Sequence, residues 1–205
     1  MSVGLSSLSG MTTIALFHSV MGVRPGFLDA AEMLRSHGHM VHVVDQYDGR
    51  VFDDYDIALE FMQGIGFPTL KELALKATAE LPDGFVPMGF SNGGGMAEYV
   101  AGCRPGVSGV VMLAGALDPK EVGVSWPEGV DGQVHTTVDD PWREQEGIDA
   151  VSSAAEKAGG RVEVYDYPGS GHLFADPSKT DEFQPAEAKL MWSRVLDFLR
   201  RVEQS

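Results

Sequence analysis

The stretch Gly89-Phe90-Ser91-Asn92-Gly93 has the pattern G-x-S-x-G and lies between a strand-like and a helix-like run. Residues 85–90 are apolar and predict a strand, and residues 94–101 predict a helix. A sharp turn between the two presents the serine hydroxyl at the top of a sheet, beside free N–H groups at the helix start. Glycines suit such a corner because it leaves no room for Cβ atoms. The motif therefore predicts a serine nucleophile for acyl transfer.

An aspartate pair follows at the end of a later predicted strand. The serine motif alone is weak evidence in a chain with 25 glycines, so it needs an acid and then a histidine in later loops. Residues 133–138 alternate in polarity and end in Asp139-Asp140-Pro141-Trp142. An aspartate at the carboxyl end of such a strand lies where ligands bind. We favour Asp140 as the acid, because Pro141 biases the residue before it toward an extended conformation, and keep Asp139 as the alternative. One of the two could instead cap a helix that begins at Pro141.

The candidate base lies in the loop after the last predicted strand. Residues 161–167 alternate and stop at Pro168-Gly169-Ser170-Gly171-His172. From this loop Nε2 of His172 could take the Ser91 proton while an aspartate holds Nδ1. The alternative is a solvent-exposed loop histidine. We favour the catalytic role because serine, acid and histidine agree in order and placement.

The remaining histidines do not predict a metal site. Residues 37, 39 and 42 are histidines, but no cysteine or glutamate accompanies them at zinc-ligand spacing. His18 ends a predicted strand and His135 lies within one, so we expect buried histidines with satisfied hydrogen bonds. No metal or organic cofactor is predicted.

Composition predicts one acidic domain. A chain of 205 residues suffices for a single core, which we place at residues 13–205, after a disordered leader at residues 1–12. The net charge of −15 argues against nucleic acid and against anionic membrane surfaces as partners. The single cysteine, Cys103, cannot form an internal disulfide. No signal peptide or membrane span is evident, so a cytoplasmic location is expected; the oligomeric state stays open.

Strand-like and helix-like segments alternate along the chain. This order predicts an α/β fold with a mostly parallel sheet of at least six strands and helices on both faces. Pro87 fits badly, because it falls in a central strand and cannot donate to the ladder. The expected strands are 13–18, 40–45, 85–90, 109–113, 133–138 and 161–167, and the expected helices are 27–36, 54–63, 69–81, 94–101, 141–158 and 185–202. Residues 118–132 are expected to be irregular.

Four motifs together resemble the dienelactone hydrolase family of α/β-hydrolases over residues 14–199. They are Phe17-His18-Ser19-Val20-Met21-Gly22, Gly89-Phe90-Ser91-Asn92-Gly93-Gly94, Val138-Asp139-Asp140-Pro141-Trp142 and Gly169-Ser170-Gly171-His172-Leu173-Phe174-Ala175. The resemblance implies an α/β-hydrolase fold and hydrolysis of an ester or lactone through an acyl-enzyme, without a metal or organic cofactor.

The chain departs from the best-known members of that family at three positions. It has Ser91 where they have cysteine, and Ser19 where they have a glutamate that helps to activate it. The two changes agree, because a serine relies on the histidine base. Asp176 stands close to where they carry an arginine for the substrate carboxylate. A neutral ester or lactone, rather than a carboxylated dienelactone, is therefore the expected substrate.

The remaining site residues follow from this mechanism. The N–H groups of Val20 and Asn92 are the expected oxyanion donors. A pocket lined by the apolar side chains of Met21, Phe61, Trp142 and Phe174 is the expected substrate site.

Two other functions stay open. Gly93-Gly94-Gly95 could cradle a phosphate or nucleotide at the helix start, although no Lys or Arg lies in that loop. A non-catalytic small-molecule binding protein with this fold would have the same motifs, because a complete triad does not prove turnover.

Overall fold

The computed structural model describes residues 11–204, which form a three-layer α/β structure around one parallel sheet. Within these residues six strands are hydrogen-bonded in the order β2-β1-β3-β4-β5-β6, and every neighbouring pair is parallel. The strands are β1 (Thr13–Phe17), β2 (Met40–Val44), β3 (Val86–Phe90), β4 (Gly109–Leu113), β5 (Asp131–Thr137) and β6 (Val162–Tyr167). The helices are α1 (Pro25–Ser36), α2 (Tyr55–Ile65), α3 (Phe67–Thr78), α4 (Asn92–Cys103), α5 (Pro119–Val122), α6 (Gln145–Lys157) and α7 (Pro185–Val202).

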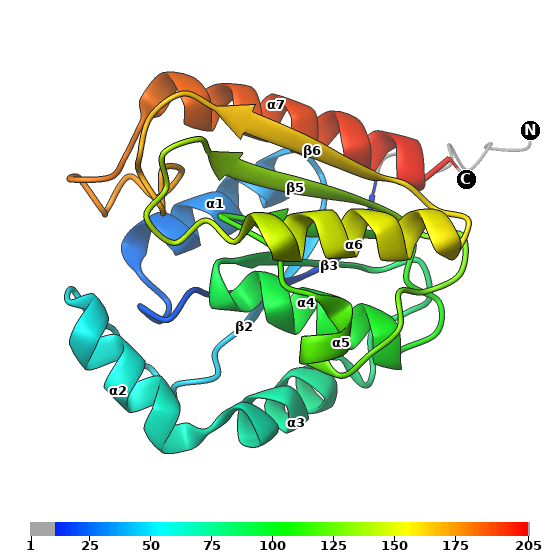
Figure 1. Cartoon of the computed structure of the whole chain (residues 1–205), viewed down its shortest axis with the longest axis horizontal. Helices are drawn as coiled ribbons and strands as arrows, with labels where there is room; N and C mark the ends of the chain where they lie inside the picture. Colours follow the sequence, from blue (N-terminus) through cyan, green and yellow to red (C-terminus); the bar gives the residue numbers. More distant parts are fainter. Residues whose placement is uncertain (1–10, 205) are drawn as a thin grey trace, which may run out of the picture.

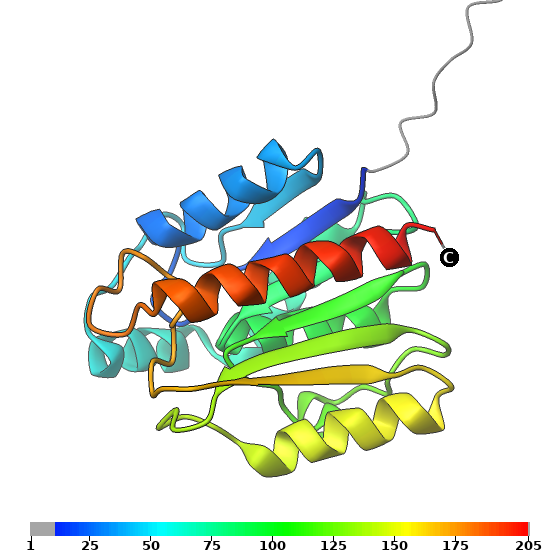
Figure 2. The ribbon, with the colours of Figure 1, turned by 90° about the horizontal axis from the view of Figure 1, so that it is seen from above.

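Helices cover both faces of the sheet, as the alternating sequence predicts. Figures 1 and 2 show α1 and α7 on one face and α4 on the other. β2 lies on one side of β1 and β3 lies on the other, so the chain adds strands first toward one edge of the sheet and then toward the opposite edge. Right-handed crossovers therefore place α1 and α4 on opposite faces. The predicted α/β fold with at least six strands and helices on both faces is confirmed, and the described sheet, expected to be mostly parallel, is entirely parallel.

Burial along each strand follows its place in the sheet. Every residue of β1, β3 and β4, in the middle, is buried, and these strands are almost wholly apolar. The edge strands β2 and β6 mix buried and exposed residues instead. This difference is expected, because central strands of a parallel sheet are covered on both faces.

Pro87 lies in β3, close to the centre of the sheet, where its missing N–H group needs an explanation. β3 pairs with β1 over residues 86–89 but with β4 only from Met88 onward. An isolated bridge between Phe85 and Val107 comes earlier, and one extra residue on the β4 side separates it from the main ladder. Pro87 therefore lies where pairing with β4 is interrupted, which is where sheets tolerate proline.

Most predicted elements are shifted at their ends by a few residues, and two segments differ further from the sequence prediction. The helix expected over 141–158 begins only at Gln145, because the N–H of Trp142 donates to Asp140 Oδ1 at 2.8 Å and closes a turn first. The stretch expected to be irregular contains the short helix α5, which Asp118 caps by accepting from the N–H of Lys120.

The N-terminal prediction lies mostly outside the described residues. Of the leader expected over residues 1–12, residues 1–10 are not described. Thr12 is buried, and its carbonyl accepts from the N–H of Met40 at 3.0 Å, so Thr12 belongs to the packed part of the chain.

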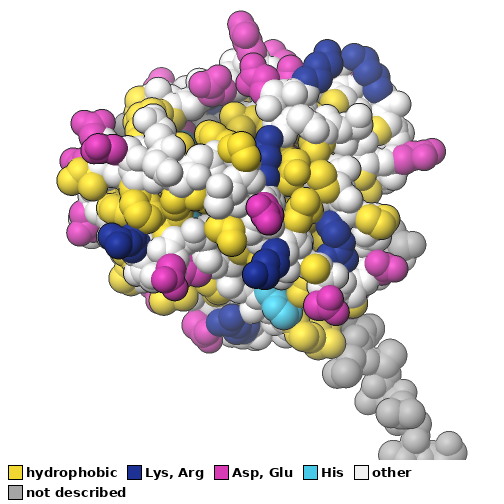
Figure 3. Space-filling model, turned by 90° about the horizontal axis from the view of Figure 1, so that it is seen from below, with side chains coloured by type: hydrophobic (Ala, Val, Ile, Leu, Met, Phe, Trp, Pro, Cys, Tyr) yellow, Lys and Arg dark blue, Asp and Glu magenta, His cyan; other side chains and the backbone are white. Residues whose placement is uncertain are grey.

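The described surface mixes charges of both signs. Figure 3 shows acidic and basic side chains interspersed with apolar ones on one face. Within residues 11–204, no helix combines the length and the apolar character that crossing a membrane requires.

Glu98 is a buried acid in helix α4. Its Oε1 accepts from the N–H of Leu117 at 2.9 Å, and its Oε2 has no partner among the described residues. Desolvation raises the pKa of Glu98 from 4.5 to about 8. The carboxyl is therefore neutral at pH 7, and it holds the loop after β4 against α4.

This burial predicts how stability depends on pH. Unfolding lets Glu98 ionise near pH 4.5, whereas in the fold it ionises only near pH 8, so rising pH destabilises the fold between these values. Glu98→Gln keeps the acceptor for Leu117 and removes the ionisable group. We expect its stability advantage to grow by up to about 1.4 kcal/mol per pH unit in this window and to level off above it.

Urea unfolding at pH 5.5, 6.5, 7.5 and 8.5 measures the difference in unfolding free energy between Glu98→Gln and the unsubstituted protein. The exposed Glu80→Gln variant is the control and should show no such growth. A gap between Glu98→Gln and the unsubstituted protein that stays constant across the series would contradict the prediction.

Candidate active site

Ser91 lies at the sharp corner between β3 and α4 in a strained backbone conformation. Its φ is 52° and its ψ is −118°, and its N–H donates to the carbonyl of Leu113 on β4 at 2.6 Å. A Cβ on Gly89 would overlap the carbonyl of Gly93, and one on Gly93 would lie 2.5 Å from the carbonyl oxygen of Phe17. The corner therefore requires glycine at both positions, and it presents the Ser91 hydroxyl at the carboxyl edge of the sheet.

Ser91, His172 and Asp140 form a continuous hydrogen-bonded chain. Ser91 Oγ lies 2.7 Å from Nε2 of His172, and Nδ1 of His172 lies 2.7 Å from Oδ2 of Asp140. A carboxylate can only accept at Nδ1, so Nδ1 carries the proton and Nε2 is free to accept from the serine hydroxyl. Both His172 and Asp140 are buried, so water competes little for these hydrogen bonds.

The two neighbouring aspartates have different surroundings. Asp140 is buried, and its second oxygen, Oδ1, accepts from the N–H of Trp142. Asp139 is exposed, and its N–H donates to the carbonyl of Gly169 at 3.0 Å. The structure therefore brings Asp140, and not Asp139, to His172, while neither caps α6, whose N-cap is Glu144.

Hydrogen bonds on both sides hold the backbone of His172. The N–H of Gly171 donates to Gln184 Oε1 at 3.0 Å, and the N–H of Leu173 donates to Glu182 Oε2 at 2.6 Å. The hydroxyl of Thr137, at the end of β5, donates to the Gly171 carbonyl at 3.0 Å. The imidazole position therefore depends on the segment before α7 as well as on the sheet.

His18 fixes the peptide group that carries the N–H of Val20. Its Nδ1 lies 2.6 Å from the carbonyl oxygen of Ser19, and its Nε2 accepts from the N–H of Gln46 at 3.1 Å. His18 is therefore the neutral Nδ1–H form, and burial lowers its pKa. Because the C=O and N–H of one trans peptide point in opposite directions, holding the Ser19 carbonyl also sets the direction of the Val20 N–H.

A cleft of about 200 Å³ opens beside the Ser91 hydroxyl. Apolar groups provide most of its surface, and Val20 and Asn92 lie in its wall. Among the described residues that line it, Glu144 is the only Asp, Glu, Lys or Arg. Its lining residues are Val20, Tyr55, Leu59, Met62, Phe67, Ser91, Asn92, Ala114, Gly115, Ala116, Leu117, Trp142, Glu144 and His172.

Only one of the four predicted pocket residues lines this cleft. Trp142 does so, whereas Met21 and Phe174 are fully buried in the core. Phe61 lies on the other side of α2, packed against Tyr47 with ring centroids 5.1 Å apart. The cleft instead uses the stripe of α2 formed by Tyr55, Leu59 and Met62, which our sequence analysis missed.

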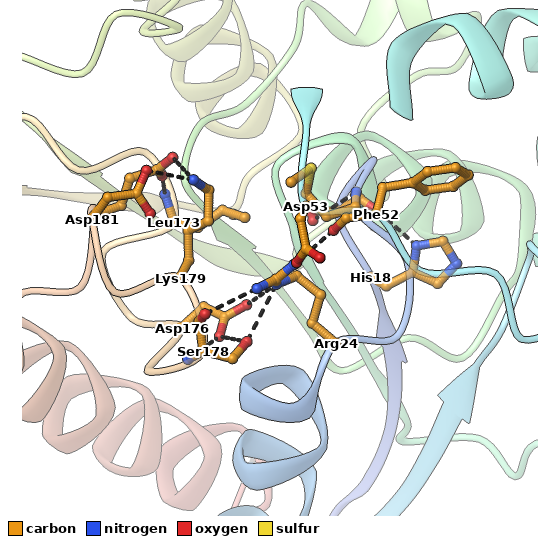
Figure 4. A network of polar contacts seen from close by, with 12 residues as sticks. His18, Arg24, Phe52, Asp53, Leu173, Asp176, Ser178, Lys179 and Asp181 are labelled. Carbon is orange, nitrogen blue, oxygen red and sulfur yellow. Dashed lines mark hydrogen bonds and ion pairs between the residues drawn. The ribbon is translucent and has the colours of Figure 1, made fainter. Parts of the chain in front are cut away.

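Asp176 lies outside the cleft, in an ion pair with Arg24. Arg24 is buried, and its Nε lies 3.5 Å from Asp176 Oδ2. The other guanidinium nitrogens donate to Asp53 Oδ1 and the Phe52 carbonyl, both at 2.6 Å, and to the Ser178 carbonyl at 2.9 Å. Figure 4 shows the guanidinium between Asp53 on one side and Asp176 and Ser178 on the other. Asp176 therefore has a structural role. Carboxylate substrates are disfavoured instead because no Lys or Arg is among the described residues that line the cleft.

The remaining polar candidates have structural surroundings. His135 is fully buried between Tyr167 Oη at 2.8 Å and Gln133 Oε1 at 3.0 Å, and desolvation lowers its pKa to about 3. Within residues 11–204, no three His, Cys, Asp or Glu side chains lie close enough together to hold a metal ion. Gly93, Gly94 and Gly95 are buried, and their lack of side chains is explained by close packing against other segments.

The chain was compared with known proteins. The model of the dienelactone hydrolase family matches residues 6–203. A search of curated proteins found no match.

Solved structures share the fold at low sequence identity. The chain is similar to m3DLH, at 20% identity and a TM-score of 0.76 over 96% of this chain and 89% of that one. It is also similar to the dienelactone hydrolase-like promiscuous phosphotriesterase P91 from metagenomic libraries, at 16% identity and a TM-score of 0.73 over 93% of this chain and 86% of that one. The chain is similar to the carboxylesterase of Bacillus cereus at 16% identity and a TM-score of 0.60, over 95% of this chain and 90% of that one.

The surroundings of the two aspartates predict opposite mutant behaviour. We expect Asp140→Asn to lower kcat by up to about 10⁴-fold, because an asparagine amide favours the wrong imidazole tautomer. The exposed Asp139→Asn variant should retain kcat to within a few-fold. Both are measured by kcat on p-nitrophenyl acetate, with melting temperatures as a check on folding. If only Asp139→Asn lost turnover, the acid that holds His172 would be Asp139 and not Asp140.

The hydrogen bond from His18 predicts an effect on rate rather than on substrate binding. His18→Leu removes the donor to the Ser19 carbonyl, and we expect kcat to fall by about 10²-fold with little change in KM, the signature of a misplaced oxyanion donor. His18→Asn can restore a donor near Nδ1 and should recover part of the loss. Equal falls in kcat for both variants, in step with their melting temperatures, would indicate a purely structural role.

Proposed function

Because the chain belongs to the dienelactone hydrolase family, we propose that it hydrolyses a small ester or lactone through an acyl-enzyme on Ser91. The observation that carries the proposal is the pair of 2.7 Å contacts that join Ser91, His172 and Asp140 beside an apolar cleft. A nucleophile within hydrogen-bond reach of a base, with the base oriented by a third group, is the arrangement that activates a serine.

The reaction proceeds in two steps at one serine. In the first, Ser91 Oγ attacks the substrate carbonyl carbon while its proton passes to Nε2 of His172. The resulting oxyanion accepts from the N–H groups of Val20 and Asn92, and Asp140 stabilises the imidazolium. His172 then gives its proton to the leaving alcohol oxygen as the carbon–oxygen bond breaks. In the second step water repeats the attack, and the acid and free Ser91 are released.

The cleft favours substrates without a carboxylate. No Lys or Arg is among the described residues that line it, and Glu144 adds a negative charge to its wall. Burying a substrate carboxylate there would leave its charge unpaired, which is unfavourable in an apolar site. A small ester or lactone that lacks a free acid group is therefore the proposed substrate.

The alternative functions have less support. A phosphate site at Gly93-Gly94-Gly95 is disfavoured, because these residues are buried against β1 and the loop after β4. A non-catalytic binding protein has no need to hold Ser91 at a φ of 52° with its hydroxyl on a buried histidine. The named activities of P91 and of the Bacillus cereus carboxylesterase fit hydrolysis of ester-type bonds.

Ser91 should be the only residue that reacts covalently with a serine-hydrolase probe. We expect a fluorophosphonate to add one adduct by intact mass and to abolish cleavage of p-nitrophenyl acetate. Ser91→Ala should take up no adduct and should lose about 10³-fold or more in kcat, because no acyl-enzyme can form. Ser170→Ala, which changes another loop serine, is the matched control. Turnover by Ser91→Ala near that of the unsubstituted protein would refute the mechanism.

A further inference from the structure

The wall of the cleft beside His172 is aromatic. The Tyr55 and Trp142 rings lie 5.8 Å apart, and each lies 6.2 Å from the His172 ring, measured between centroids. Under the mechanism above, His172 returns its proton to the leaving alcohol, so this wall faces the alcohol half of a bound ester. Trp142 is 48% exposed and therefore keeps part of its ring available to a ligand.

A carboxylate accompanies the aromatic wall without a cation to balance it. Glu144 lines the cleft two residues after Trp142, is exposed, and forms no ion pair with any described side chain. The neighbouring Arg143 pairs instead with Asp166 at 2.8 Å and does not line the cleft. The whole chain carries a net charge of −15, so its field attracts cations.

One lysine approaches the same wall from outside the cleft. Nζ of Lys179 lies 5.4 Å from the centroid of the Tyr55 ring. Its charge is paired with Asp181 at 2.6 Å and Glu182 at 3.4 Å, so it cannot neutralise a group inside the cleft. Since Lys179 already occupies a position over Tyr55, Trp142 is the ring available to a second cation.

From these features we propose that the preferred substrate is an ester whose alcohol half carries a positively charged ammonium group. The inference rests on the proposed esterase function and adds the substrate class. The ammonium group lies against the Trp142 ring, where the π-electrons attract it, and near the Glu144 carboxylate. Trp is the strongest such partner among the aromatic side chains, and aromatic side chains are the usual recognition groups for quaternary ammonium ligands.

A pair of isosteric esters tests the charge alone. Acetylcholine and 3,3-dimethylbutyl acetate have the same shape, but the second has a neutral carbon in place of the quaternary nitrogen. Calorimetric titration of the Ser91→Ala variant measures binding without turnover. We expect acetylcholine to bind about tenfold more tightly at low ionic strength, with the preference reduced in 0.5 M NaCl.

Substitutions in the Ser91→Ala background locate the preference. Trp142→Leu should bring the two affinities close together, and Trp142→Tyr should restore part of the difference. Glu144→Gln should reduce the preference by about threefold, whereas Glu146→Gln, an exposed carboxylate outside the cleft, should leave it unchanged. Equal affinities for the two esters before any of these changes would overturn the inference.

Turnover by the unsubstituted enzyme separates this inference from the function on which it rests. Cleavage of p-nitrophenyl acetate with equal kcat/KM for the two isosteric esters would leave the esterase standing and refute the ammonium site. Selective binding of acetylcholine with no cleavage of any of the three esters would support the ammonium site and refute the esterase. A preference for acetylcholine in both kcat/KM and affinity supports both.

Discussion

The corner between β3 and α4 is the constraint on which the site depends. Gly89 and Gly93 leave no space for a Cβ atom, so α4 begins directly against the backbone of β1 and the end of β3. This approach forces Ser91 to a φ of 52° and lets its N–H reach the Leu113 carbonyl. Backbone strain at such a position persists only when the surrounding packing fixes it. Here the buried helix α4 and the fully buried strands β1, β3 and β4 supply that packing.

Local sequence patterns predicted most of the fold, because polarity and glycine placement report on burial directly. The strand at Gly109–Leu113 and the helix at Pro185–Val202 were predicted to the residue. The start of α6 was predicted wrongly, because the Asp140 side chain closes a turn before the helix begins. A proline after an aspartate suits both such a turn and a capped helix start. The order of the strands and the interrupted pairing at Pro87 depend on contacts between distant segments, which no local pattern contains.

The site was predictable where chemistry restricts the residue type and unpredictable where only shape matters. The contacts among Ser91, His172 and Asp140 match the arrangement that the motif order indicated, although their catalytic role stays a proposal. The prediction of the residues that line the cleft was mostly wrong, because any apolar residue near a motif fitted it. The spacing of Tyr55, Leu59 and Met62 along one face of α2 was a usable signal, since Phe61 falls on a different face.

Arg24 joins segments that are far apart in the chain. It begins α1, and its guanidinium binds both the segment that leads into α2 and the loop that follows His172. Opening of either loop would leave part of the buried Arg24 guanidinium without its hydrogen-bond acceptors, so we expect the opening of one loop to favour the opening of the other. We therefore expect α2, which forms one wall of the cleft, and the loop that carries His172 to open together as one unit of local unfolding. Backbone amides in both segments would then exchange their hydrogens with solvent at a shared rate, set by a single opening event.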